Sequence, residues 1–282
     1  MKSSNKNPLV SVIIPTKNEE RNISRCLDSI MKNGYPNYEI IVVDQESTDN
    51  TKKICDKFEV KFISVKKSNI YQPPSQSRNT GFEHSKGKFI FNLDADMELS
   101  RGLIGELVQL MKNDSVSAII VPEEDKPLNY WARVKAYERK ISQGTKVEAA
   151  RFSRSSVFSK TKYDKNIFSG EDWNIHNKFK ELGTISRSKK VIYHHIGKIS
   201  IFSEFRKKYQ YGYSSIHFVN NESKQIKGLF FTLLASYITS VTKTIIVDPL
   251  LVFGFVILRL VDLIALTAGY VSASIFNTNN IK

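Results

Sequence analysis

Short apolar runs alternate with amphipathic patterns from Leu9 to Val121. The runs are rich in β-branched side chains and have the length of buried strands: LVSVII, YEIIVV, VKFISV, KFIFNL and VSAIIV. The patterns between them predict helices of about ten to fifteen residues. One begins near Ser100, its expected N-cap, and places on one face Leu103, Leu107, Leu110 and Met111. This alternation predicts an α/β fold of parallel βαβ units with helices on both faces of the sheet.

The pattern is less regular from about Pro122 to His195. One helix is predicted near LNYWARVKAYERKI. Another is predicted over GEDWNIHNKFKELG, where an acidic start suits the helix dipole and Gly183 marks the end. The run VIYHHIGKIS predicts a further strand. We expect residues 1–198 to form one catalytic-type α/β domain.

The remaining stretch, residues 199–282, differs in kind. Between Leu229 and Phe276 the charged residues among forty-eight positions are Lys243, Asp248, Arg259 and Asp262. This composition favours a basic connector followed by membrane-associated helices. GLFFTLLASYITSVTKTIIV has about the length of a bilayer span, whereas LLVFGFVILRLVDLIAL carries two charges that would be costly at the bilayer centre. With Pro249 between the segments, an interfacial or re-entrant hairpin and two spanning helices are both open.

Charge and cysteine content narrow the class of protein. The net charge is +14, and nine of the basic residues, against two acidic ones, lie between Gly183 and Gly228. Because this basic segment precedes the apolar tail and contains no nucleic-acid reading motif, we expect it to meet anionic headgroups rather than nucleic acid. Cys26 and Cys55 are predicted to be reduced core thiols. No secretory signal precedes the first strand, so the catalytic domain is expected on the cytoplasmic side of a membrane.

Carboxylates follow two of the predicted strands. Asp94 and Asp96 come directly after KFIFNL, and Asp44 follows EIIVV, so all three lie at strand ends where α/β sheets bind ligands. After the first strand the chain has PTKNEE and not a glycine-rich phosphate loop. A divalent metal between a carboxylate and a diphosphate would instead hold the phosphate groups and neutralise their charge.

Four motifs follow one another along the chain: VSVIIPTKNEERNISRCLDSI, YEIIVVDQESTDNT, SQSRNTGFEHSKGKFIFNLDADM and SGEDWNIHNKFKELG. In this order and spacing they resemble the family 2 glycosyltransferases of the GT-A fold. The resemblance implies a Rossmann-like mixed sheet flanked by helices, and an inverting transferase that uses a nucleotide-sugar donor. Departures from the family pattern, DQEST after the second strand among them, leave the choice between UDP and GDP open.

The resemblance also implies roles for individual residues. The nucleotide would be bound by Pro15, Thr16, Glu19, Asp44, Arg78 and Asp94. Asp96 would ligate manganese or magnesium, with help from His194 or His195, of which only one can face the site because successive strand residues point opposite ways.

The ED motif, Glu171-Asp172, would supply the base that takes the acceptor proton. Asp172 is the first choice, because an apposed carboxylate raises the pKa of its neighbour. The Trp173 ring could form the floor of the sugar-binding site, and Arg154 could contact the acceptor.

Three functions remain open at this point. The leading hypothesis is transfer from a UDP- or GDP-sugar to a hydroxyl of a lipid-linked or cell-envelope glycan. The second is a polyprenyl-phosphate sugar synthase, whose acceptor phosphate has little use for a base. The third is a non-catalytic membrane protein that binds nucleotide sugars.

Overall fold

The computed structural model describes residues 7–66, 74–144, 148–164, 170–214, 237, 240–241 and 244–279. The chain divides into two compact units. The first takes in Met1–Glu124, Ala149–Lys165 and Glu171–His195, and the second Asp125–Glu148, Asn166–Gly170 and Ile196–Lys282. Besides its last segment, which begins at Ile196, the second unit thus includes two segments from the middle of the chain.

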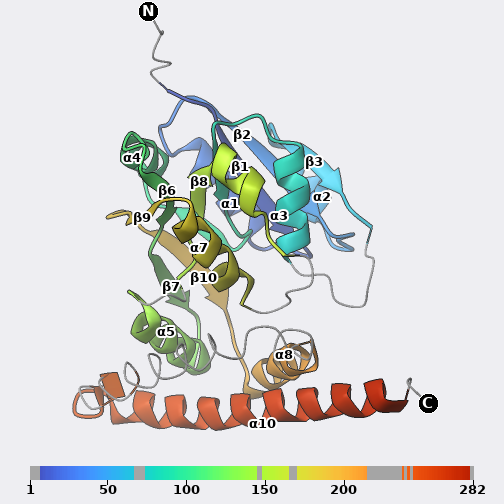
Figure 1. Cartoon of the computed structure of the whole chain (residues 1–282). Coiled ribbons are helices and arrows are strands. Elements are labelled where there is room, and N and C mark those ends of the chain that lie inside the picture. The colour runs from blue at the N-terminus through green and yellow to red at the C-terminus, as the bar shows by residue number, and fades with distance from the viewer. Residues whose placement is uncertain are drawn as a thin grey trace, which may run out of the picture. The chain divides into compact units, whose positions relative to one another are not determined.

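The first unit is built on a sheet whose seven described strands lie in the order β3-β2-β1-β4-β8-β6-β9 (Figure 1). The strands are β1 Val10–Thr16, β2 Tyr38–Asp44, β3 Lys61–Ser64, β4 Phe89–Asn92, β6 Val116–Ile120, β8 Phe152–Arg154 and β9 Thr184–Arg187. The first four are parallel, as predicted. β8, which the sequence pattern did not predict, lies antiparallel between β4 and β6, so the sheet is mixed and not wholly parallel.

A second sheet of three short strands has the order β5-β10-β7. Its strands are β5 Met97–Leu99, β7 Glu123–Pro127 and β10 Ile192–Gly197. β5 and β10 are antiparallel, with His194 opposite Met97. The pairing brings the predicted histidine strand directly alongside the segment that follows the two aspartates.

Helices pack on both faces of the main sheet, as the alternation predicted. They are α1 Ile23–Met31, α2 Thr51–Cys55, α3 Pro74–Glu83, α4 Leu103–Leu110, α6 Ser155–Thr161 and α7 Glu171–Glu181. Because side chains alternate along a strand, Val12 and Ile14 of β1 enter the core shared with α1 and α4, whereas Ile13 enters the core shared with α6 and α7. Both cysteines are buried free thiols, as expected.

The prediction of Ser100 as the N-cap of α4 is wrong. α4 begins at Leu103, and its N-cap is Gly102, which has a left-handed backbone with φ 75°. This turn redirects the chain before the helix, and the Leu103 amide donates to the Ser100 carbonyl at 3.2 Å. Of the predicted apolar face, Leu103, Leu107 and Met111 are fully buried.

The strand order places a topological switch point between β1 and β4. The chain runs from β1 outward through β2 to β3, and then returns to the other side of β1 as β4. In the register, Thr16 lies opposite Asp44, and Ile13 lies opposite Asn92. Asp94 and Asp96 therefore leave the sheet at the switch point, where open α/β sheets bind ligands.

Helix α3 approaches the sheet closely because of Gly81. A Cβ at this position would overlap the Ile13 side chain and lie 3.3 Å from Val43. The same helix buries polar residues, including Ser77 and Arg78. Close contact between α3 and β1 is thus what carries Arg78 to the carboxyl end of the strands.

The second unit contains three long helices: α5 Tyr130–Ser142, α8 Ile201–Ser214 and α10 Pro249–Asn279. α10 runs alongside both α5 and α8 (Figure 1). In the described part of the chain, Pro249–Ile275 is the one stretch long and apolar enough to cross a membrane, with a mean hydropathy of 2.4. Most of the other predicted apolar helix, residues 228–247, lies outside the described residues.

We expect Gly81→Ala to lower the free energy of unfolding by about 1–3 kcal/mol, because the added methyl group overpacks the contact between α3 and β1. Gly105→Ala is the matched control: it also lies inside a helix, but a Cβ there meets no atom within 4 Å. That variant should be neutral or stabilised by about 0.5–1 kcal/mol. Denaturant unfolding measures both, and equal effects of the two substitutions would contradict the packing argument.

Candidate active site

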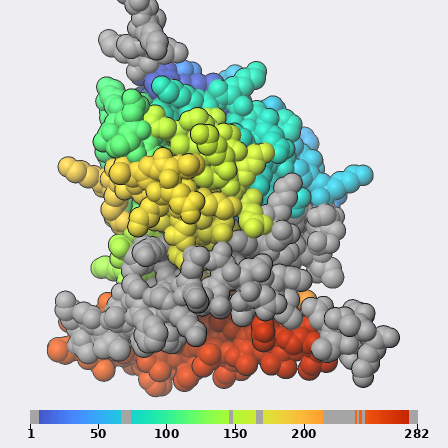
Figure 2. Space-filling model, viewed as in Figure 1, coloured from blue at the N-terminus to red at the C-terminus, as the bar shows by residue number. Residues whose placement is uncertain are grey.

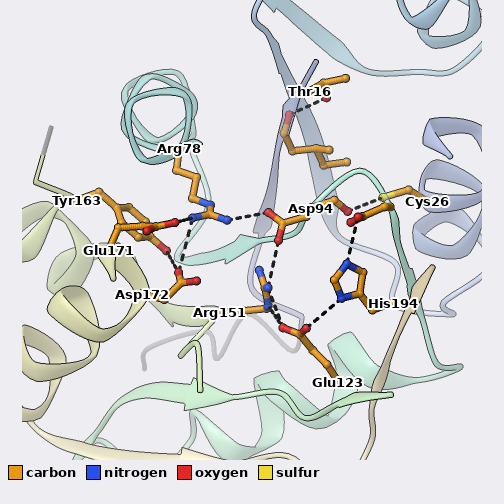
Figure 3. Close-up of polar contacts among 12 residues, drawn as sticks. Thr16, Cys26, Arg78, Asp94, Glu123, Arg151, Tyr163, Glu171, Asp172 and His194 are labelled. Atoms are coloured by element: carbon orange, nitrogen blue, oxygen red, sulfur yellow. Dashed lines mark hydrogen bonds and ion pairs between the residues drawn. The ribbon is translucent and has the colours of Figure 1, made fainter. Parts of the chain in front are cut away.

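Asp94 lies between two buried arginine side chains (Figure 3). Its Oδ1 is 2.7 Å from Nη2 of Arg78, and its Oδ2 is 3.1 Å from Nη2 of Arg151. Burial by itself would raise the pKa of Asp94, but the two guanidinium groups hold this pKa well below its usual range. Asp94 is therefore a fixed negative charge at the switch point.

Arg151 was not predicted from the sequence, because β8 was not recognised as a strand. Its carbonyl accepts a hydrogen bond from the Asn92 amide at 2.9 Å, which extends the pairing of β4 with β8 toward Asp94. The Arg151 guanidinium also contacts Glu123 at 2.9 Å through Nε and at 2.7 Å through Nη2. A strand prediction for ARFSR opposite KFIFN would have brought Arg151 to the site.

Glu123 links this cluster to His194 (Figure 3). His194 lies with Nε2 at 3.0 Å from Asp96 Oδ2 and with Nδ1 at 3.4 Å from Glu123 Oε2. His195 points elsewhere, with Nε2 at 2.8 Å from Glu98 Oε2. The geometry therefore places His194, and not His195, beside the carboxylates that follow β4, and adds Glu123 to the residues found there.

The ED motif begins α7 on the other side of Arg78. Nη1 of Arg78 lies 3.8 Å from Glu171 Oε1 and 3.6 Å from Asp172 Oδ1. The Tyr163 hydroxyl donates a long hydrogen bond of 3.5 Å to Asp172, and the Tyr163 ring packs against the Arg78 guanidinium at 5.2 Å. One buried arginine thus faces three carboxylates: Asp94 and both residues of the ED motif.

The two ED carboxylates have different surroundings. Burial, followed by the nearby charge of Asp172, raises the pKa of Glu171 to about 7, although Arg78 opposes this shift. Glu171 therefore binds and releases a proton near neutral pH. A carboxyl group with a pKa near 7 is suited to general base chemistry.

The predicted nucleotide residues line the ends of β1 and β2. Thr16 and Asp44 are buried, and both Asp44 oxygens accept hydrogen bonds from Ser47, one from its amide and one from its hydroxyl. Pro15 is half-buried and lies opposite Val43 of β2. Burial raises the pKa of Glu19, with smaller effects from Asp96 and Asp94, and Asn22 donates to this carboxylate at 2.8 Å.

The two candidate sugar and acceptor residues lie in different environments. Trp173 is 7% exposed, and its indole N–H has no hydrogen-bond partner among the described residues. Arg154 donates to the carbonyls of Met111, Asn113 and Val116 and thereby ties the ends of β6 and α4 to β8. These are structural contacts, and we leave Arg154 out of the proposed site.

A divalent metal fits the residues near Asp96. Among the described residues no three His, Cys, Asp or Glu side chains form a ready metal shell. Asp96 Oδ1, however, is buried and makes no hydrogen bond to the described part of the chain. Because magnesium-like cations keep water and substrate phosphate ligands, one or two carboxylates suffice to bind them. Asp96, with His194 beside it, has the chemistry for this role.

Comparison with known proteins shows the family to which the chain belongs. The model for glycosyl transferase family 2 matches residues 11–183, more than half of the chain. The chain belongs to this family and has its GT-A fold. Mannosyltransferase PcManGT from Pyrobaculum calidifontis, solved in complex with GDP-Man and Mn2+, superposes with a TM-score of 0.63 at 18% identity, over 95% of this chain and 87% of that one.

Two curated relatives match shorter stretches. Glycosyltransferase AglE of Haloferax volcanii is 40% identical over 93 residues, which is 32% of this chain and 31% of that protein. The Escherichia coli UDP-Glc:alpha-D-GlcNAc-diphosphoundecaprenol beta-1,3-glucosyltransferase WfgD is 32% identical over 107 residues, 38% of this chain and 42% of that protein. Each match thus covers less than half of the relative.

We expect Glu171→Gln to stabilise the chain more at pH 8 than at pH 5. The folded chain keeps a proton on Glu171 up to a pKa of about 7, whereas the unfolded chain releases it near 4.5, so stability falls as pH rises through this window. Glutamine does not titrate, so the variant does not lose stability in this way. The difference in free energy of unfolding between the variant and the native chain should therefore grow by about 2 kcal/mol from pH 5 to pH 8. Denaturant unfolding at each pH measures it.

Glu181→Gln is the control, because Glu181 lies at the exposed end of the same helix. A parallel response of the two variants to pH would show that the raised pKa of Glu171 is not the cause.

Proposed function

We propose that this chain is an inverting glycosyltransferase that moves a sugar from a UDP- or GDP-linked donor to a hydroxyl of a lipid-linked or cell-envelope glycan. Family 2 membership supports sugar transfer. The printed name of WfgD gives a UDP-linked donor and an acceptor on diphosphoundecaprenol, and PcManGT was solved with GDP-Man and Mn2+. The observation that carries the proposal is the buried Arg78, which joins Asp94 of the Asp94-Ala95-Asp96 motif to Asp172 of the ED motif.

The proposed donor site lies at the carboxyl ends of β1, β2 and β4. Pro15, Thr16, Glu19 and Asp44 would contact the nucleoside, and Asp94 would lie by the ribose. Arg78 and Arg151 offset the charge of Asp94 and would keep the site from repelling a diphosphate. We assign Asp96 and His194 to a manganese or magnesium ion, which when bound would neutralise charge on the diphosphate.

The proposed base is Asp172, with Glu171 as the second choice. Its carboxylate takes the proton from the acceptor hydroxyl while the acceptor oxygen forms a bond to the anomeric carbon. The bond from that carbon to the nucleoside diphosphate breaks on the opposite face, and the electron pair leaves with the diphosphate. Arg78, 3.6 Å from Asp172, and Tyr163, which hydrogen bonds to it, hold the carboxylate in place. Trp173 on the same helix is our candidate for contact with the sugar.

A polyprenyl-phosphate sugar synthase remains the second candidate function. Its acceptor would already be an anionic phosphate, and the basic composition of the chain, with a net charge of +14, favours such a ligand. The two candidates differ in their need for a base, and this difference can be measured.

Metal-dependent nucleotide binding tests the enzyme proposal first. Isothermal titration of detergent-solubilised protein with UDP and with GDP, each with and without manganese, should show binding of one nucleotide that requires the metal. Asp96→Ala should abolish the metal-dependent part, because it removes the proposed ligand. Glu98→Ala is the control, since Glu98 contacts His195 and not His194. Nucleotide binding that is unchanged both by omitting manganese and by Asp96→Ala would contradict the proposed metal site.

The second test concerns the base. Asp172→Asn should lower turnover about a hundredfold or more while nucleotide affinity stays within a few-fold of the native value, because only proton removal is lost. Turnover is measured with UDP- and GDP-sugars on a GlcNAc-diphosphoundecaprenol acceptor. Glu181→Gln, at the far end of α7, should keep native turnover. Nearly native turnover of Asp172→Asn on this hydroxyl acceptor would contradict its role as the base, whereas turnover on undecaprenyl phosphate in its place would favour the polyprenyl-phosphate sugar synthase.

A further inference from the structure

Helix α10 exposes apolar residues and buries charged ones, which is the opposite of a helix on the surface of a water-soluble protein. None of its exposed described residues is charged, and the most exposed include Leu250 at 71%, Phe253 at 64% and Leu263 at 62%. Between Leu250 and Ile275 the exposed positions recur at helical spacing and form one apolar face: Leu250, Phe253, Val256, Leu260, Leu263, Ile264, Leu266, Thr267, Tyr270, Val271 and Ile275. Figure 2 shows the side chains of α10 as a continuous band.

The charged residues of α10 lie on its other face, in contact with α5 and α8. Arg259 pairs with Asp262 at 2.8 Å and with Glu138 of α5, where its Nη2 donates at 2.6 Å. Lys208 of α8 lies 3.5 Å from Asp262. The same network continues through Lys135, which is 2.8 Å from Glu138 and 2.6 Å from Glu204 of α8. Although burial opposes ionisation, Lys135 and Arg259 hold the pKa of Glu138 at about 2, so this carboxylate stays charged.

Glycines bring these helices into close contact. A Cβ at Gly269 would overlap the Tyr209 carbonyl, and one at Gly212 would overlap the Leu266 carbonyl, so α8 and α10 cross without side chains between them. At the other end of α10, a Cβ at Gly254 would overlap the Tyr130 hydroxyl of α5. The network and the close crossings together fix which face of α10 is buried within the unit.

This arrangement opposes a transmembrane orientation. Asp262 is the midpoint of the apolar stretch Pro249–Ile275, so a spanning α10 would carry Asp262 and its partners to the bilayer centre. Helices α5 and α8, which carry these partners, would then also enter the bilayer. Helix α8 would take its exposed residues Arg206 and Lys207 with it. Charges at that depth are costly.

We propose that α10 lies parallel to the membrane surface, with its exposed apolar face inserted into one leaflet of an anionic bilayer. From Leu250 to Ile275 this face is about 40 Å long, which suits an in-plane amphipathic helix. Lys198, Arg206 and Lys207, all exposed near the start of α8 and on it, supply charge for anionic headgroups. The inference rests on the proposed function in one respect: insertion of α10 would hold the chain at the membrane that contains the proposed acceptor.

Sidedness of the helix ends tests the orientation. Leu250→Cys and Ile275→Cys are each labelled with the fluorophore NBD, and labelling reaches only the new thiol because Cys26 and Cys55 are fully buried. The labelled proteins are added to preformed vesicles of neutral and anionic phospholipid, and dithionite is then added outside. An in-plane helix leaves both labels open to reduction, so more than nine-tenths of each signal is lost. Protection of one label until detergent is added means that α10 spans the bilayer and overturns the proposal.

Flotation with the same vesicles tests the inserted face. Leu260→Glu combined with Leu263→Glu should weaken vesicle binding at least tenfold, whereas Leu182→Glu, an exposed leucine of the first unit, should bind like the native chain. Nucleotide binding by each variant shows that the first unit is folded and reports separately on the proposed function. A native chain that fails to float with anionic vesicles, or that dimerises through this face in buffer, contradicts the inference even if sugar transfer is confirmed.

Discussion

The contact of Asp94 with two buried guanidinium groups determines how the first unit presents its site. Each partner comes from a different element: Asp94 follows β4, Arg78 belongs to α3, and Arg151 precedes β8. Removing one partner of a buried ion pair commonly costs about 3–5 kcal/mol, because the remaining charge is left without compensation. The position of α3 against β1 and the antiparallel insertion of β8 therefore serve the same electrostatic requirement.

That requirement also explains the state of the ED motif. Arg78 is shared among Asp94, Glu171 and Asp172, so its charge cannot fully compensate all three carboxylates. The closest contact, at 2.7 Å, is with Asp94, and the pKa of Glu171 is raised to about 7 by burial and by Asp172. A fixed anion at Asp94 and a Glu171 carboxyl group that exchanges a proton near neutral pH thus lie around one shared cation.

In the second unit, the free-energy cost of burying charged side chains is offset in a different way. Here six charged residues from α5, α8 and α10 compensate one another within the unit, and the apolar side chains of α10 are left outward. In both units, the buried charges have partners from separate elements, and the arrangement of helices follows from that pairing. An apolar composition alone would not distinguish this helix from a membrane span.

The sequence by itself determined the local elements and the family. Strands β1, β2, β3, β4 and β6, helices α5 and α7, and the two aspartates at the switch point all follow from periodicity, β-branched content and ordered motifs, which are properties of neighbouring residues. Only the tertiary structure brought Arg151 and Glu123 to the site, because β8 is short and its pairing with β4 joins residues far apart in the chain. The pleat of β10 against β5 decided that His194 lies beside Asp96, and the contacts of α5 and α8 decided which face of α10 is exposed. These outcomes depend on long-range pairing of charges and backbone, which no local pattern encodes.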